Sequence, residues 1–420
     1  MRVRTLCPSV LVLLLLRCVF GQTSSNLAMV HANVVDVRTG SVEKDATVLI
    51  SESKIKAVLP GKSAKVASGA RVIDAHGGYL IPGLWDMHVH SEGDKRVLRL
   101  MLASGITGIR DMGGDVYKLA EARRHIEAQD WDGPRLLFAG PMLEGPPGES
   151  DDDMWIVHTP EEAQQAVASL AALHVDFIKV HDHLGRDVYF AIAAAAKKAG
   201  LPFAGHVTAS ISPLEASDAG QASIEHFEFL PKVCVPLLGD MALGDERLPN
   251  DCTHTFTEAL LRHLADNGTW LDPTLQSFRY FAPLQWKQIL AGFKEIGGQI
   301  RTEHILMLAG TDWSAFLESK GAHPGWCLHD ELDLLVAVGF TPLQALQAAT
   351  LNPAIFLSME DSIGTIEAGK VADLVLVQGN PLMAIGNSRR VVAVIARGAF
   401  FDRSRLHRLA AGASRDRRLN

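Results

Sequence analysis

The chain has 420 residues, of which 47% are hydrophobic and 21% are charged, and its formal net charge at pH 7 is -8. This length and apolar content are ample for one large core with a small domain beside it, and they exclude a disordered chain and a coiled coil. The acidic balance argues against nucleic acid as a partner.

The first 21 residues have the pattern of a cleavable secretory signal. Arg2 and Arg4 precede an apolar run from Val10 to Leu16, which is too short to span a bilayer, and Gly21 is a small residue at the expected cleavage point. We therefore expect a secreted or periplasmic protein without a stable membrane span. Cleavage would remove basic residues and no acidic ones, so the mature chain would be more acidic still.

Three cysteines remain after the expected cleavage. In an oxidising compartment Cys234 and Cys252, which flank one probable loop, could form a disulfide and leave Cys327 unpaired. No Cys-x-x-Cys spacing requires this pairing, so the sequence leaves it open.

Short strand patterns separated by turns occupy both ends of the chain. They occur between residues 29 and 72 and again between 364 and 395. Neither set is large enough to fold alone. We therefore predict one small β-sandwich domain made by residues 22–82 together with 361–405, followed by a basic tail at 406–420 that we expect to be solvated.

Between these ends, over residues 83–360, strand and helix patterns alternate. Thr159, Ser212 and Thr341 are each followed by proline and, two residues later, by Glu or Gln, which predicts capped helix starts. Eight such strand–helix units are what a (β/α)8 TIM-like barrel needs, and these barrels place their chemistry at the carboxyl ends of the strands. The eight candidate strands are residues 83–90, 105–111, 134–139, 176–180, 202–207, 222–227, 269–275 and 305–312.

Five of these strands end in groups that can bind a metal. The first ends in His-Val-His, and side chains two apart on a strand project from the same face. Each group alone has an ordinary explanation as a solvated lysine, a core histidine or a helix-capping aspartate. Together, at matching strand ends, they indicate a metal site. The residues are His88, His90, Lys179, His206, His226 and Asp312.

Two flanking motifs complete this pattern. Gly-Tyr-Leu-Ile-Pro-Gly-Leu-Trp-Asp precedes the first histidine pair, and Ala-Gly-Lys-Val-Ala-Asp-Leu-Val-Leu lies near the end of the chain. With the strand-end residues, the sequence resembles the amidohydrolase superfamily over residues 33–401. Within that superfamily it is similar to the imidazolonepropionase-like branch, which includes metal-dependent, prolidase-like Xaa-Pro dipeptidases.

The resemblance implies a binuclear metal centre. We expect two zinc ions per chain because imidazole and carboxylate ligands suit zinc, although other divalent metals stay open. A neutral amine in an apolar strand, with its pKa lowered by burial, can react with carbon dioxide to form a carbamate. By the resemblance, His88, His90 and Asp312 bind one ion, His206 and His226 bind the other, and carboxylated Lys179 bridges both.

The implied reaction is hydrolysis of an amide bond. A hydroxide held between the ions would attack a carbonyl, and Asp312 would pass its proton to the leaving amine. We therefore expect cleavage of a dipeptide, an Xaa-Pro bond or an N-acyl amino acid. A cyclic amidase or lactonase, a one-metal site with unmodified Lys179, and a non-catalytic binding protein on the same barrel stay open.

Loops after the strands should select the substrate, a small molecule or a peptide. A dipeptide needs its terminal carboxylate bound, for which Arg110, Arg279 or His181 would serve. Tyr280 and His323 are further candidates, and a solvated loop position explains each of the five equally well. The sequence leaves the oligomeric state open, a homo-oligomer included.

Overall fold

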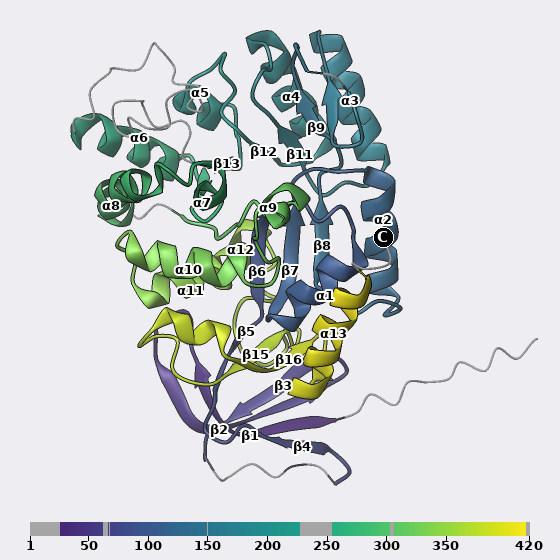
Figure 1. Cartoon of the computed structure of the whole chain (residues 1–420), viewed down its shortest axis with the longest axis vertical. Helices are drawn as coiled ribbons and strands as arrows, with labels where there is room; N and C mark the ends of the chain where they lie inside the picture. Colours follow the sequence, from purple (N-terminus) through teal and green to yellow (C-terminus); the bar gives the residue numbers. More distant parts are fainter. Residues whose placement is uncertain are drawn as a thin grey trace, which may run out of the picture.

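The computed structural model describes residues 26–61, 66, 68–148, 150–226, 254–302 and 306–416. Strands from both ends of the chain form a sheet at the base of the molecule, drawn in purple and yellow, and alternating strands and helices lie above it (Figure 1). The expected signal at residues 1–21 and the pair Cys234 and Cys252 lie outside the described residues. Cys327 is buried, and within the described residues it is not in a disulfide.

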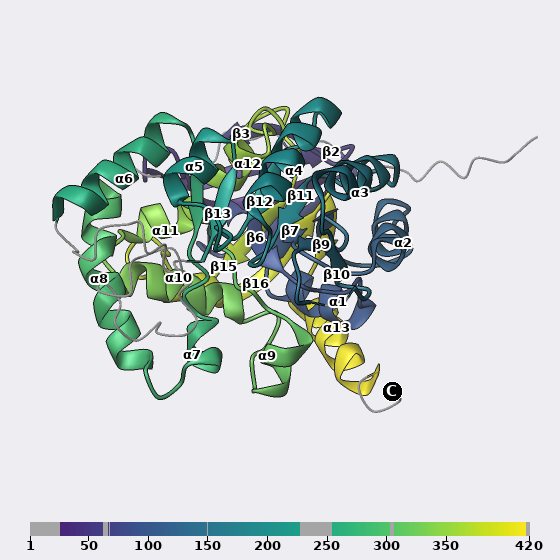
Figure 2. The same cartoon turned by 90° about the horizontal axis from the view of Figure 1, so that it is seen from above.

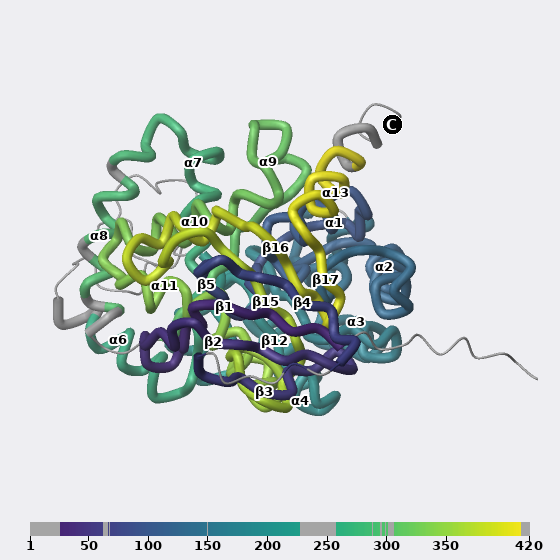
Figure 3. Tube along the Cα trace, turned by 90° about the horizontal axis from the view of Figure 1, so that it is seen from below, coloured from purple at the N-terminus to yellow at the C-terminus, as the bar shows by residue number. Residues whose placement is uncertain are grey.

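The basal sheet joins the two ends of the chain. Its strand order is β17-β16-β15-β5-β1-β2-β3, with β4 pairing β1, and Figure 3 shows it from below. β15 and β5 pair antiparallel, so Leu374 lies opposite Pro82 and Val377 opposite Tyr79. The β-sandwich and its limits stay predictions. The strands are β1 (Leu27–Val35), β2 (Val42–Ser51), β3 (Lys54–Leu59), β4 (Arg71–Asp74), β5 (Tyr79–Pro82), β15 (Leu374–Val377), β16 (Val391–Ala396) and β17 (Ala399–Phe401).

The strands above the basal sheet pair in parallel and form two sheets. One has the order β10-β9-β11-β12-β13-β14, and the other has the order β6-β7-β8. Seven of these strands fall on the first seven predicted barrel strands, because short apolar runs between helices mark them. Their bounds are β6 (Leu84–Val89), β7 (Ile106–Asp111), β8 (Arg135–Phe138), β9 (Met142–Glu144), β10 (Met154–Ile156), β11 (Ile178–Val180), β12 (Phe203–Gly205), β13 (Ser223–Glu225) and β14 (Trp270–Asp272).

The predicted eighth strand is an extended segment at residues 306–313 rather than a regular strand. Leu308 N–H donates to Leu271 O over 2.8 Å, and His90 N–H donates to Trp313 O over 2.7 Å. The segment pairs with β14 and β6 only through isolated parallel bridges. It therefore lies between the two sheets. Parallel strands alternating with helices in this arrangement give a TIM-barrel-type α/β fold.

The predicted helix starts are confirmed. Ser212 and Thr341 each form a reciprocal capping box, and the Thr159 hydroxyl accepts from the Glu162 N–H. The Glu162 carboxylate accepts from the His158 N–H instead of the cap, so this third box is not reciprocal.

Helices surround the parallel strands, as the view from above shows (Figure 2). In the part of the chain that the structure describes, none of them has the length and apolar character needed to cross a membrane. The helices are α1 (Lys95–Ala103), α2 (Val116–Glu127), α3 (Pro160–Ala172), α4 (Arg186–Ala199), α5 (Pro213–Asp218), α6 (His254–Asp266), α7 (Phe278–Phe281), α8 (Trp286–Thr302), α9 (Ala315–Ser319), α10 (Cys327–Ala337), α11 (Pro342–Ala348), α12 (Leu351–Phe356), η2 (Ile385–Arg389) and α13 (Arg403–Asp416).

The tail at residues 406–420, predicted to be solvated, is packed on one side in its described part, whereas Arg408 is exposed. Residues 406–416 belong to α13, which packs against α1. Leu406 is buried in an apolar cluster with Leu102 and Phe401, and Leu409 packs against this cluster. The sequence of this segment is dominated by arginines, so its apolar residues at helical spacing were not recognised as a buried face.

We predict that Leu406→Ala lowers the free energy of unfolding by about 2 to 4 kcal/mol, because it leaves a cavity between α13 and α1. Arg408→Ala, at an exposed position of the same helix, should change it by less than about 0.5 kcal/mol. Denaturant unfolding measures both values. Equally small effects would contradict the packing of α13.

Candidate metal centre

The structure brings the six predicted ligands to one cavity. The cavity has a volume of about 430 Å³ and lies at the carboxyl ends of the parallel strands. β6, β11, β12, β13 and the segment 306–313 each supply at least one of the six residues, within the strand or directly after it. The residues are His88, His90, Lys179, His206, His226 and Asp312.

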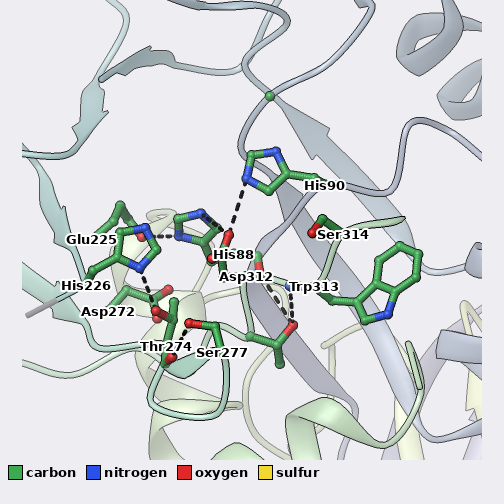
Figure 4. Close-up of polar contacts among 12 residues, drawn as sticks. His88, His90, Glu225, His226, Asp272, Thr274, Ser277, Asp312, Trp313 and Ser314 are labelled. Atoms are coloured by element: carbon green, nitrogen blue, oxygen red, sulfur yellow. Dashed lines mark hydrogen bonds and ion pairs between the residues drawn. The ribbon is translucent and has the colours of Figure 1, made fainter. Parts of the chain in front are cut away.

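These side chains converge closely. His88 Nε2 and His90 Nε2 each lie 3.5 Å from Asp312 Oδ1. The ring of His226 lies 4.8 Å from the ring of His88 and 4.8 Å from that of His206, measured between centroids. Figure 4 shows His88, His90, His226 and Asp312 around one space. Ligand atoms of His88, His226 and Asp312 lie within 4.8 Å of one another, which is close enough to share one ion.

Two of the ligand positions have a strained backbone. His226 has a φ of 60° and Asp312 a φ of 52°, a left-handed conformation that costs about 1 to 3 kcal/mol for residues other than glycine. His226 N–H donates to Asp272 O over 2.7 Å, and Asp312 N–H donates to His88 O over 2.8 Å, which hold this conformation. Strain of this kind concentrates at functional sites.

The cavity favours neutral nitrogen ligands. Burial lowers the pKa of His88 and His206 well below the ordinary value, and it lowers the pKa of His226 to about 4. Burial also lowers the pKa of the Lys179 amine. At His90 burial acts in the same direction, but the hydrogen bond and charge of Asp312 outweigh it and raise the pKa.

Two buried nitrogen atoms in this cavity show that the residues fit a metal ion. Among the described residues, His88 Nε2 and Lys179 Nζ find no hydrogen-bond partner. An unsatisfied buried polar atom costs about 1 to 3 kcal/mol, so such atoms need an explanation. Imidazole nitrogens beside a carboxylate are the ligands that zinc and related divalent metals prefer. A bound cation would satisfy the lone pair of His88.

The second nitrogen of each buried imidazole is held by an outer residue, which leaves Nε2 as the ligand atom. These outer residues were missed by the sequence analysis, because nothing in their spacing marks them. His88 Nδ1 lies 2.9 Å from Glu225 Oε2, His226 Nδ1 lies 2.6 Å from Thr274 Oγ1, and His206 Nδ1 bonds the Asp182 carboxylate.

The prediction that Arg110 binds a substrate carboxylate is wrong. Its side chain is only 1% exposed. Nη2 donates to Glu225 Oε1 over 2.9 Å, Nε to Met87 O over 2.6 Å, and Nη1 to Ser223 Oγ over 2.9 Å. The guanidinium therefore pairs with the carboxylate that holds His88, inside the strands.

Of the other four candidate substrate residues, only His181 lines the cavity. Its Nδ1 lies 2.5 Å from the buried Glu144 Oε2. Arg279 and Tyr280 do not line the cavity, and His323 lines a separate one. His181 stays a candidate for substrate contact, and the predictions for the other three are not supported by their positions.

The predicted family is confirmed by comparison with known proteins. The model of the amidohydrolase family matches residues 79–400, and the chain therefore belongs to this family. All six converging residues lie within the matched region.

Individual proteins that match this chain share only a low sequence identity with it. An adenine deaminase of Chelativorans sp. (strain BNC1) is 26% identical over 85% of this chain, but this chain covers only 55% of that protein. A crystal structure of a Xaa-Pro dipeptidase with bound methionine in the active site has a TM-score of 0.74 at 22% identity, covering 90% of this chain and 100% of the other. A putative prolidase from Bifidobacterium longum has a TM-score of 0.73 at 24% identity, with coverages of 93% and 100%. At these identities the structural similarity shows the fold alone.

We predict that Glu225→Gln damages both stability and metal binding. Arg110 would lose the carboxylate that it hydrogen-bonds and keep as counter-charge only the longer contact with Asp272 Oδ2 at 3.6 Å, so the free energy of unfolding should fall by about 3 to 5 kcal/mol. His88 would lose its orienting carboxylate, so the affinity for added zinc should fall about 10- to 100-fold. Denaturant unfolding and calorimetric zinc titration measure the two effects.

Glu258→Gln is the matched control, since Glu258 pairs with Arg262 at the surface of α6. This control should lower the free energy of unfolding by less than about 1 kcal/mol and leave the zinc affinity unchanged. Equal behaviour of the two variants would contradict the role given to Glu225.

Proposed function

We propose that the chain is an exported metal-dependent hydrolase that cleaves the amide bond of a dipeptide, an Xaa-Pro substrate or an N-acyl amino acid. The observation that carries this proposal is the convergence of four histidines, a lysine and an aspartate on one cavity. Membership of the amidohydrolase family supports the hydrolysis of a carbon–nitrogen bond. The fold similarity to prolidases favours a peptide-like substrate, and export rests on the pattern of residues 1–21.

We further propose two zinc ions per chain. When bound, such ions lower the pKa of water and polarise a carbonyl group. Lys179 would carry a carboxyl group: its neutral amine would form a bond to the carbon of carbon dioxide, one C–O π bond would break to leave the negative charge on oxygen, and the nitrogen would release one proton to water. Burial supports this step because it lowers the pKa of the amine. His88, His90 and Asp312 would hold one ion, His206 and His226 the other, and carboxylated Lys179 would be a ligand of both.

Asp312 is the residue proposed to move the proton. Burial by itself would raise the pKa of this carboxyl, but the hydrogen bond with His90 and the neighbouring positive charges lower it. Its oxygen therefore accepts a proton from the attacking water and passes it to the leaving nitrogen. Thr274 and Asp182 keep His226 and His206 in their orientations during this step.

The finer architecture belongs to the same proposal. The segment 306–313 bonds both β14 and β6, and the N–H of Asp176, two residues before β11, donates to Phe138 O in β8 over 2.9 Å. We propose that these two links join the strands into the predicted (β/α)8 ring. Such a ring would surround the cavity with the carboxyl ends of its strands.

Deamination of an aminopurine is a second candidate function. The similarity to an adenine deaminase extends over 85% of this chain. Attack on a ring carbon that carries an amino group would use the same metal ligands and the same carboxylate. Release of ammonia distinguishes this reaction from amide cleavage.

The test is turnover of methionyl-proline, N-acetylmethionine and adenine by protein purified without chelators. We expect release of a free amino acid from one of the first two, loss of this activity on chelation and its return with zinc. Asp312→Asn should lower kcat at least about 100-fold, whereas Asp130→Asn, at an exposed position, should not. Ammonia from adenine alone would favour the deaminase, and no zinc-dependent turnover would refute the proposal.

A further inference from the structure

Part of the wall of the metal cavity is apolar. Met142, Met154 and Phe278 line it together with two aromatic rings, those of Phe281 and Phe316. Phe278 is buried, but Phe281 is 41% exposed and Phe316 is 52% exposed. Exposed apolar side chains that gather at a concave site mark a surface for ligands, because covering them with an apolar group is favourable.

The two exposed rings come from different elements and are fixed against each other. Phe281 ends α7 and Phe316 lies in α9, which appear as neighbours in Figures 1 and 2. Their centroids are 5.6 Å apart and their planes differ by 17°, which is a stacked arrangement. Lys320 Nζ lies over the Phe316 ring, 5.4 Å from its centroid. The two rings therefore form one continuous aromatic surface at the cavity.

Both rings are tied closely to the metal ligands. The short helix α9 starts three residues after Asp312, and the Ser314 hydroxyl caps it by accepting from the Leu317 N–H. α7 follows β14 by six residues, and Thr274 in that connection holds His226. The distance between the aromatic pair and the ligands is thus set by short connections.

We propose that the stacked rings of Phe281 and Phe316 form an aromatic contact surface, here called the clamp. The clamp selects amide substrates that carry a phenyl-sized apolar group beside the scissile bond. The clamp binds this group while the carbonyl lies at the metal ligands, so it raises the affinity for aromatic or bulky alkyl amides over small ones. This inference rests on the proposed function, because it assigns a substrate class to the same cavity.

The test compares benzohydroxamate with acetohydroxamate, two metal-binding probes that differ only by a phenyl ring in place of a methyl group. Calorimetry on the zinc-loaded protein should show benzohydroxamate binding at least about tenfold tighter, since a well-placed apolar group is worth roughly this factor. Phe281→Ala and Phe316→Ala should each lower the affinity for benzohydroxamate about 3- to 10-fold and leave that for acetohydroxamate unchanged. Leu284→Ala, which removes an apolar side chain that is 91% exposed near α7, should change neither.

The possible results distinguish a failure of the clamp proposal from a failure of the metal-centre proposal. Equal affinity of the unmodified protein for the two probes, or an equal effect of all three variants, would overturn the clamp and leave the metal centre in place. Failure of both probes to bind would overturn the metal centre and the clamp with it. As a second measurement, kcat/KM for N-benzoyl- against N-acetylmethionine should show the same preference and lose it in the two phenylalanine variants.

Discussion

The carboxylate of Glu225 is the contact on which the site depends most. It lies on β13 in one parallel sheet and bonds His88 of β6 and Arg110 of β7 in the other. All three side chains are almost fully buried. A buried carboxylate is tolerated only with such partners, so the charge pair and the orientation of His88 are stabilised together. The two sheets are thereby joined directly behind the ligands.

A second set of constraints fixes Asp312. Thr311 donates to Asp86 through its hydroxyl, over 2.8 Å, and through its N–H, over 3.0 Å, so the segment 306–313 is bonded to the first strand of the site. Gly310 is required here because a Cβ at this position would lie 2.5 Å from the Cβ of His88. The left-handed Asp312 directly follows these two residues, and its N–H donates to His88 O over 2.8 Å. A strained, tightly bonded ligand position is what a pre-organised metal site needs.

The convergence of the six residues on one cavity could be predicted from sequence, because each lies at the end of a predicted strand and the carboxyl ends of parallel strands meet at one edge. The contacts that orient these residues could not be predicted, since Glu225 is 137 residues from His88 and 115 from Arg110 in the sequence. Arg110 was misassigned for the same reason: an arginine at a strand end gives no sign of a buried partner. The stacking of Phe281 and Phe316 depends on how two short helices pack, and the arginines of α13 concealed its apolar stripe.

The most direct test of the metal centre is the zinc content per chain, measured by plasma emission on protein purified without chelators, for the unmodified chain and for Lys179→Ala. The account predicts about two zinc ions in the unmodified chain and about one or none in the variant, because Lys179 is the residue proposed to contribute to both ions. An unmodified chain that takes up no zinc, or a Lys179→Ala chain that keeps both ions, would contradict it.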